Sequence, residues 1–128
     1  ELGLYKDPIQ YFGMLSMEMH RAIRLVVDTG IHSKGWTREQ AIQYSLDNEA
    51  DSEESVIAEI ERYMATPGQA LSYKIGQLKI RELRTKAETK LGDTFSITEF
   101  HNQVLNSGSL PLVLLEEKID NWIKTQLQ

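Results

Sequence analysis

Residues 24–42, RLVVDTGIHSKGWTREQAI, carry the clearest structural signals of the chain. An apolar run with helical spacing reaches a break at Thr29-Gly30, and Thr37 followed by Gln40 forms a capping-box pattern that opens another helix. The intervening HSKGW holds a second glycine and a large aromatic residue. The pattern predicts two helices joined by a tight connection, the first ending at Gly30.

Cap signals of the same kind divide the rest of the chain into helices. They are Asp7-Pro8 for the first helix, Asp51 with Glu54 for a third, Thr66-Pro67-Gly68-Gln69 for a fourth ending at Leu91-Gly92, Ser96 with Glu99 for a fifth, and Pro111 for a sixth. No segment alternates apolar and polar residues with a period of two, so no strands are predicted. We therefore expect an all-α fold, a compact multi-helix bundle forming a single domain over residues 1–128.

Composition narrows the function classes. The 128 residues include 14 basic and 19 acidic ones, for a formal charge of −5, which argues against a nucleic-acid surface. No window approaches the roughly 18 apolar residues of a membrane span. The absence of cysteine excludes disulfides and thiolate metal sites. There is also no HExxH motif, phosphate-binding loop or G-x-S-x-G turn, so the chain alone lacks the parts of a hydrolase.

A polar stripe runs along the first helix. Glu18, Arg21, Arg24 and Asp28 recur every three or four residues, at pairing distance on one face, and His32 follows Gly30. A solvated face laced with ion pairs is the simpler interpretation. The stripe reaches far into an apolar helix, however, and buried charges must be paired or meet a ligand. One wall of a binding site is therefore the second interpretation.

A second group of residues opens the fourth predicted helix. TPGQALSYKIGQLKI places Gln69 and Tyr73 one turn apart, with Gly76 on the same face. Close helix packing would explain the glycine. Room for a bound chain beside the tyrosine would explain it equally, because a phenol hydroxyl can donate a hydrogen bond to a developing oxyanion.

The chain resembles a known bacterial family. The stretches LYKDPIQYFG, HRAIRLVVDTGIHSKGWTREQAI, RYMATPGQALSYKIGQLKIRELR and FHNQVLNSGSLPL are similar to the C-terminal portion of domain of unknown function 885, over essentially the whole chain. Members of that family resemble gluzincin-type zinc metallopeptidases, in which two histidines of HExxH and a downstream glutamate bind zinc. The resemblance implies that this chain is the C-terminal fragment of a larger helical zincin-like protein.

The same resemblance implies catalytic roles for two residues. Tyr73 would donate the hydrogen bond that stabilises the tetrahedral oxyanion, and His32 would be a second donor or a clamp on the substrate backbone. The chain itself would hold no metal or other cofactor. Zinc would belong to the parent protein, in an N-terminal catalytic half that this chain lacks.

Substrate-binding roles follow in the same way. Arg21 and Arg24 would hold a carboxylate or orient the zinc-binding glutamate, Asp28 would fix one arginine, and Gln69 would bind a peptide group. The expected partners are a peptide substrate and the missing catalytic half, with no nucleic acid and no membrane span. Apolar surface left bare by the missing half predicts self-association, so a homo-oligomer is a further expectation.

Two other functions remain open on the sequence. The chain could be a non-catalytic helical module that binds an acidic or C-terminal peptide, or a structural domain without a site. Because relatives look secreted or lipid-anchored, we expect the parent protein to be periplasmic or secreted in a bacterium, with or without a lipid anchor. The cytoplasm stays an alternative location.

Overall fold

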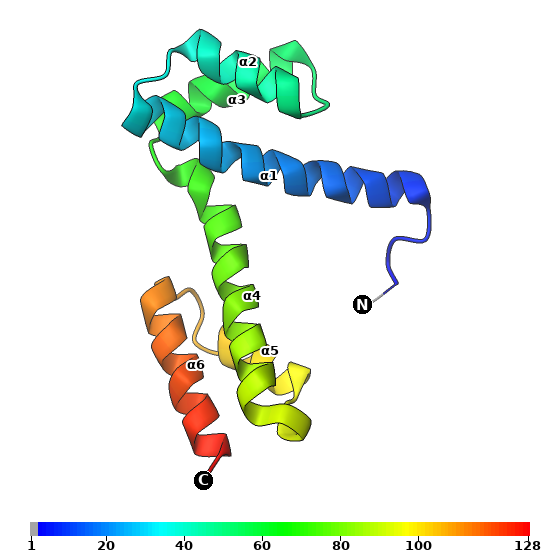
Figure 1. Cartoon of the computed structure of the whole chain (residues 1–128), viewed down its shortest axis with the longest axis vertical. Coiled ribbons are helices and arrows are strands. Elements are labelled where there is room, and N and C mark those ends of the chain that lie inside the picture. Colours follow the sequence, from blue (N-terminus) through cyan, green and yellow to red (C-terminus); the bar gives the residue numbers. More distant parts are fainter. Residues whose placement is uncertain (1–2) are drawn as a thin grey trace. The chain divides into compact units, whose positions relative to one another are not determined.

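The computed structural model describes residues 3–128 and contains no strand within that range (Figure 1). Its helices are α1 (Pro8–Lys34), α2 (Arg38–Asn48), α3 (Glu53–Ala65), α4 (Ser72–Leu91), α5 (Ile97–Leu105) and α6 (Leu112–Gln126), with 3-10 turns η1 (Gln69–Leu71) and η2 (Gly92–Thr94). The predicted all-α fold is confirmed. None of the helices described here is both long and apolar enough to span a membrane.

The helices form two compact units, one ending at Lys74 and the other spanning Ile75–Gln128. In the first unit, α2, α3 and η1 pack on α1. Its core is a cluster of buried side chains from these elements: Ile23, Val27, Ala41, Ile42, Val56, Ile60, Tyr63 and Ala70. The N-terminal half of α1 extends beyond α2 and α3 (Figure 1).

The second unit has a core of its own. One face of α4 packs with α5 and α6 around Leu83, Ala87, Leu91, Phe100, Leu115, Ile119, Trp122 and Ile123. This cluster and the cluster of the first unit share no residue. That residues 1–128 behave as a single domain stays a prediction.

Several helix starts agree with the predicted caps. Asp7 accepts a hydrogen bond of 2.8 Å from the Ile9 amide. Thr37 and Gln40 exchange both bonds of a capping box, at 3.2 and 2.9 Å, and so open α2. These caps were predictable because donor and acceptor lie within three residues of each other.

The predicted end of the first helix is wrong. α1 continues through Gly30 to Lys34 and ends at Gly35, whose φ of 69° is the left-handed conformation typical of a glycine cap. Gly30 is buried within the helix instead, and a Cβ placed on it would lie 2.5 Å from the Trp36 ring. The glycine therefore makes room for the indole that folds back onto α1.

Two other boundaries differ from the predictions. The cap of α3 is Ser52, which accepts from the Ser55 amide, and not Asp51. Thr66 ends α3 instead of starting α4, which begins only at Ser72, after η1. The apolar face of α3 is completed by the buried Tyr63, whereas the next residue, Met64, is exposed.

Candidate functional site

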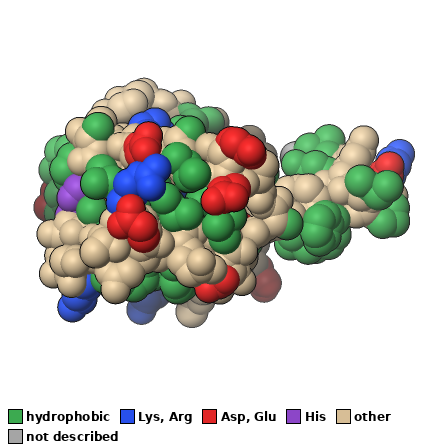
Figure 2. Space-filling view, turned by 90° about the horizontal axis from the view of Figure 1, so that it is seen from above, with side chains coloured by type: hydrophobic (Ala, Val, Ile, Leu, Met, Phe, Trp, Pro, Cys, Tyr) green, Lys and Arg blue, Asp and Glu red, His purple; other side chains and the backbone are tan. Residues whose placement is uncertain are grey.

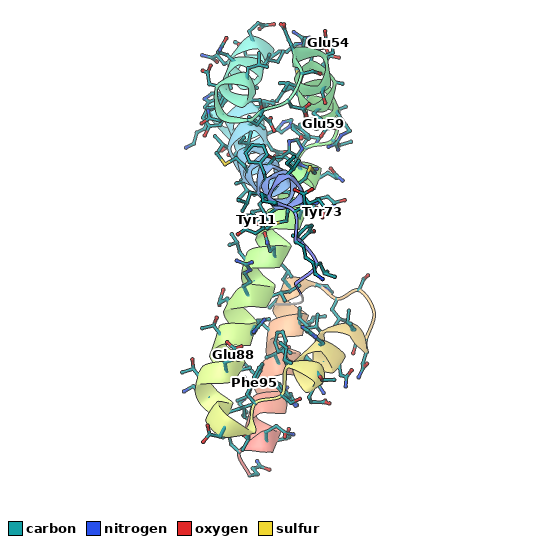
Figure 3. The ribbon with its side chains drawn as sticks, turned by 90° about the vertical axis from the view of Figure 1, so that its right-hand side faces the viewer. Tyr11, Glu54, Glu59, Tyr73, Glu88 and Phe95 are labelled. Carbon is teal, nitrogen blue, oxygen red and sulfur yellow. The ribbon has the colours of Figure 1, made fainter. Side chains whose placement is uncertain are left out.

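The polar stripe of α1 meets the first residues of α4. Arg24 is buried with 8% of its surface exposed, and its guanidinium carbon lies 5.3 Å from the ring centre of Tyr63 and 5.0 Å from that of Tyr73. Tyr73, beside α1 in Figure 3, is 54% exposed. Arg24 thus lies against one buried and one exposed tyrosine ring, and cation–π attraction favours both contacts.

Arg21 and Gln69 complete this cluster. The Arg21 guanidinium lies 5.7 Å from the centre of the Tyr73 ring and donates to the Met17 carbonyl at 3.2 Å. The side-chain amide oxygen of Gln69 accepts hydrogen bonds from Arg24 at 3.4 Å and from Arg62 at 2.9 Å. Four predicted site residues are therefore in one place, and we call Arg21, Arg24, Gln69 and Tyr73 the arginine–tyrosine cluster.

Two donors of this cluster form no hydrogen bond with any residue that the structure describes, one of them buried and the other on an exposed side chain. The buried Nε of Arg24 makes no hydrogen bond within the described residues. The hydroxyl of Tyr73 likewise has no hydrogen bond there, and its ring is exposed. An unsatisfied buried N–H costs free energy, so a ligand that accepts from this cluster would recover part of that cost.

Asp28 has a different role from the expected one. Its buried carboxylate accepts from the Gly68 amide at 3.0 and 3.2 Å and, among the residues described, forms no ion pair with Arg24. The predicted pairing of Asp28 with an arginine is therefore wrong. Asp28 instead fastens the loop before η1 to α1, which holds Gln69 and Tyr73 near the arginines.

His32 lies two helical turns beyond Arg24, a rise of about 12 Å for eight residues. Its Nε2 is 3.0 Å from the Tyr63 carbonyl oxygen. Because a carbonyl only accepts, Nε2 carries the proton of this bond, and the neutral ring leaves Nδ1 as an acceptor. His32 can donate a second hydrogen bond only when it is protonated.

Side chains of α3 that the sequence patterns did not indicate support the cluster. Glu59 accepts from Arg62 at 2.7 and 3.0 Å and from the Tyr63 hydroxyl at 2.7 Å. The Arg62 guanidinium, helped by the Tyr63 hydroxyl, lowers the pKa of Glu59 to about 2. Burial, together with the bond to Glu59, raises the pKa of Tyr63 above its usual value. The spacing of Val56, Ile60 and Tyr63 was the signal available for Tyr63.

His20 also has an unexpected partner. Its Nδ1 is 2.6 Å from Glu49, just after α2, and its Nε2 is 4.0 Å from Glu59. Within residues 3–128, no three His, Asp or Glu side chains are grouped so as to hold a metal ion.

Comparison with known proteins identifies the family. No curated protein matches the chain. Among solved structures, it is similar to one described as "The crystal structure of the putative lipoprotein from Colwellia psychrerythraea", with 51% identity and a TM-score of 0.94. The match covers 97% of this chain but 21% of the Colwellia chain, so this chain spans about a fifth of that length. Residues 1–119 match the family described as "Bacterial protein of unknown function (DUF885)". The chain belongs to this family.

Proposed function

We propose that the chain is the substrate-binding, C-terminal portion of a longer bacterial protein that hydrolyses peptides with a zinc ion. The observation that carries this proposal is the buried Arg24 Nε, which has no hydrogen-bond partner among residues 3–128, in one cluster with the exposed Tyr73. The zinc would be held by residues outside this chain, and the roles below require no metal ligand from it.

Each residue of the cluster has a role that its chemistry supports. Arg21 and Arg24 bind a carboxylate of the peptide, because a guanidinium matches a carboxylate in charge and geometry. The Tyr73 hydroxyl would donate a hydrogen bond to the oxyanion that develops on the peptide carbonyl. The side-chain amide of Gln69, whose oxygen already accepts from two arginines, offers its NH₂ group to a peptide carbonyl.

Two residues act at the edge of the cluster. Asp28 positions the loop that carries Gln69 and Tyr73, through its bonds to the Gly68 amide. His32 clamps the substrate backbone as an acceptor through Nδ1 when neutral, and as a donor when protonated. The Colwellia protein is described as a lipoprotein, and by that similarity we infer that the parent protein is exported or lipid-anchored.

Substitution of Tyr73 tests the proposal. In the full-length parent protein, or at the aligned position of the Colwellia protein, Tyr73→Phe should lower kcat for a peptide substrate at least tenfold, on the order expected for a lost oxyanion donor. Tyr11→Phe, an equally exposed tyrosine on α1, is the matched control. Unchanged turnover in Tyr73→Phe would remove the residue from its assigned role.

A titration separates the peptidase from a binding module. The isolated chain is titrated calorimetrically with a peptide bearing a free C-terminal carboxylate and with its C-terminal amide. If the isolated chain binds the free acid and the parent protein shows no peptidase activity, the chain is a peptide-binding module. A parent protein that cleaves the peptide supports the proposed function.

A further inference from the structure

A bare apolar stripe lies on the N-terminal half of α1. Ile9, Phe12, Leu15 and Met19 are 79%, 64%, 46% and 47% exposed. They lie on the same helix face as Ile23 and Val27, which are 3% and 0% exposed under α2 and α3. One continuous face of α1 is therefore covered by α2 and α3 at the C-terminal end of the helix, and the same face is uncovered over about three turns at the N-terminal end. Figure 2 shows the hydrophobic side chains on this projecting part of the helix.

The stripe borders two adjacent hollows in the first unit. One, of about 300 Å³, is lined mainly by Phe12, Leu15, Met19 and Ala50. The other, of about 290 Å³, is lined by His20 and by three acidic residues, Glu49, Asp51 and Glu59. Ser16, Glu49 and Ala50 line both, so an apolar groove passes into an acidic one.

The acidic end of the groove gathers three carboxylates. Arg62 and the Tyr63 hydroxyl contact Glu59, the charge of Arg24 also acts on Glu59, and His20 contacts Glu49 and approaches Glu59. The side chain of Glu49 is 8% exposed, which makes its charge weakly screened by solvent. A cation that enters this end would therefore be favoured.

We propose that an amphipathic helix from the part of a longer DUF885 protein outside residues 1–128 packs on this face. Its apolar stripe lies on Ile9, Phe12, Leu15 and Met19, and a lysine or arginine of the same helix reaches the acidic hollow. An uncovered stripe of this length is uncommon on the surface of a soluble protein. The Colwellia relative has about four-fifths of its chain outside the matching region, which supplies such an occupant.

This docking surface is independent of the arginine–tyrosine cluster and of the proposed peptidase activity. Amide hydrogen exchange of residues 9–19 tests it, in the isolated chain and at the aligned positions of the full-length Colwellia protein. We expect exchange at least tenfold slower in the longer protein. Phe12→Glu at the aligned position should abolish the difference, whereas Gln10→Glu, a charge on the opposite helix face, should preserve it.

Two outcomes would overturn the docking proposal. Equal exchange rates in both proteins would mean that the face stays bare in the longer chain. The second outcome is slow exchange in the isolated chain that becomes fast on dilution, together with a dimer that Phe12→Glu dissociates. This result would mean that a second copy of the chain covers the face.

The charge of the occupant is tested at Ala50, which lines both hollows. In the longer protein, Ala50→Lys should speed the exchange of residues 9–19 at least tenfold by repelling the basic residue, whereas Ala50→Glu, of similar bulk, should speed it less. The reverse order would exclude a basic residue at this end of the occupant.

Discussion

Gly30 and Gly13 lie in the same helix, α1, in opposite surroundings. A Cβ on Gly30 would lie 2.5 and 2.6 Å from two ring atoms of Trp36, whereas a Cβ on Gly13 would meet no atom within 4 Å. A mid-helix alanine is favoured over glycine by about 1 kcal/mol when nothing obstructs it. Packing against the indole reverses that preference at Gly30, because neither the ring nor the helix backbone can move freely.

We therefore predict opposite effects for the same substitution. Gly30→Ala should lower the free energy of unfolding by about 1–3 kcal/mol, as overpacking of a core does. Gly13→Ala should raise it by up to about 1 kcal/mol. Urea unfolding followed by circular dichroism measures both. A Gly30→Ala variant as stable as Gly13→Ala would show that Trp36 does not pack on α1.

At the scale of the element, α3 is stabilised by a charged network on one of its faces. Glu59 accepts hydrogen bonds from Arg62 and Tyr63 on its own helix, and the pKa of Glu59 falls from 4.5 to about 2, chiefly because of Arg62. A carboxyl with a lowered folded-state pKa stabilises the fold above its unfolded pKa. That contribution is lost as the pH falls from about 4.5 towards about 2, because the unfolded chain takes up the proton first.

Glu59→Gln should therefore make stability less dependent on pH. At pH 7 the variant should be less stable by about 1–2 kcal/mol, the size of a partly exposed, charge-assisted hydrogen bond. Near pH 2 the two proteins should differ little. Urea unfolding at pH 7, 4 and 2.5 measures the difference, with Glu54→Gln on the exposed side of α3 as control (Figure 3). A pH-independent difference would contradict the lowered pKa of Glu59.

At the scale of the whole molecule, residues 3–128 form two hydrophobic clusters without a shared residue. Val27 is fully buried in the cluster of the first unit, and Leu83 is fully buried in that of the second. Truncation of a buried leucine to alanine lowers the free energy of unfolding by about 2–5 kcal/mol. The side chains around the resulting cavity lose their contacts first.

We predict that the two units lose stability separately. Leu83→Ala should speed amide exchange of the core residues of α5 and α6 at least tenfold and leave that of α2 and α3 unchanged. Val27→Ala should do the reverse. Hydrogen exchange followed by NMR resolves both regions in one sample. An equal loss of protection in both units would instead support the single domain that the sequence predicts.

The helical plan of this chain followed from local signals. Asp7, Thr37 and Ser96 accept hydrogen bonds from amides two or three residues ahead, so the sequence alone was enough to identify them. Where two cap candidates lie side by side, as at Asp51 and Ser52, local chemistry does not distinguish them. The structure uses Ser52 for the cap, and the Asp51 carboxylate accepts hydrogen bonds from the Ser52 amide and the Ser55 hydroxyl.

The candidate site was predictable in part for the same reason. Helical spacing placed Arg21, Arg24 and Asp28 on one face, and the family resemblance connected that face with Gln69 and Tyr73. The partner of each side chain was not predictable. Arg24 packs on Tyr63, Asp28 holds the Gly68 amide, and these partners are 39 and 40 residues away in sequence.

By itself, the sequence determined that this chain is helical, where most of its helices begin, and which family it resembles. The first two properties depend on groups within about one helical turn of each other, whereas the family resemblance rests on stretches spread along the whole chain. Only the tertiary structure decided that α1 runs on past Gly30, that Asp28 fastens a loop, and that the N-terminal stripe of α1 is bare. The physical reason is desolvation. A polar group or an apolar face that is removed from water needs a protein partner, and that partner is supplied by side chains that are distant in sequence and are brought together only by the fold.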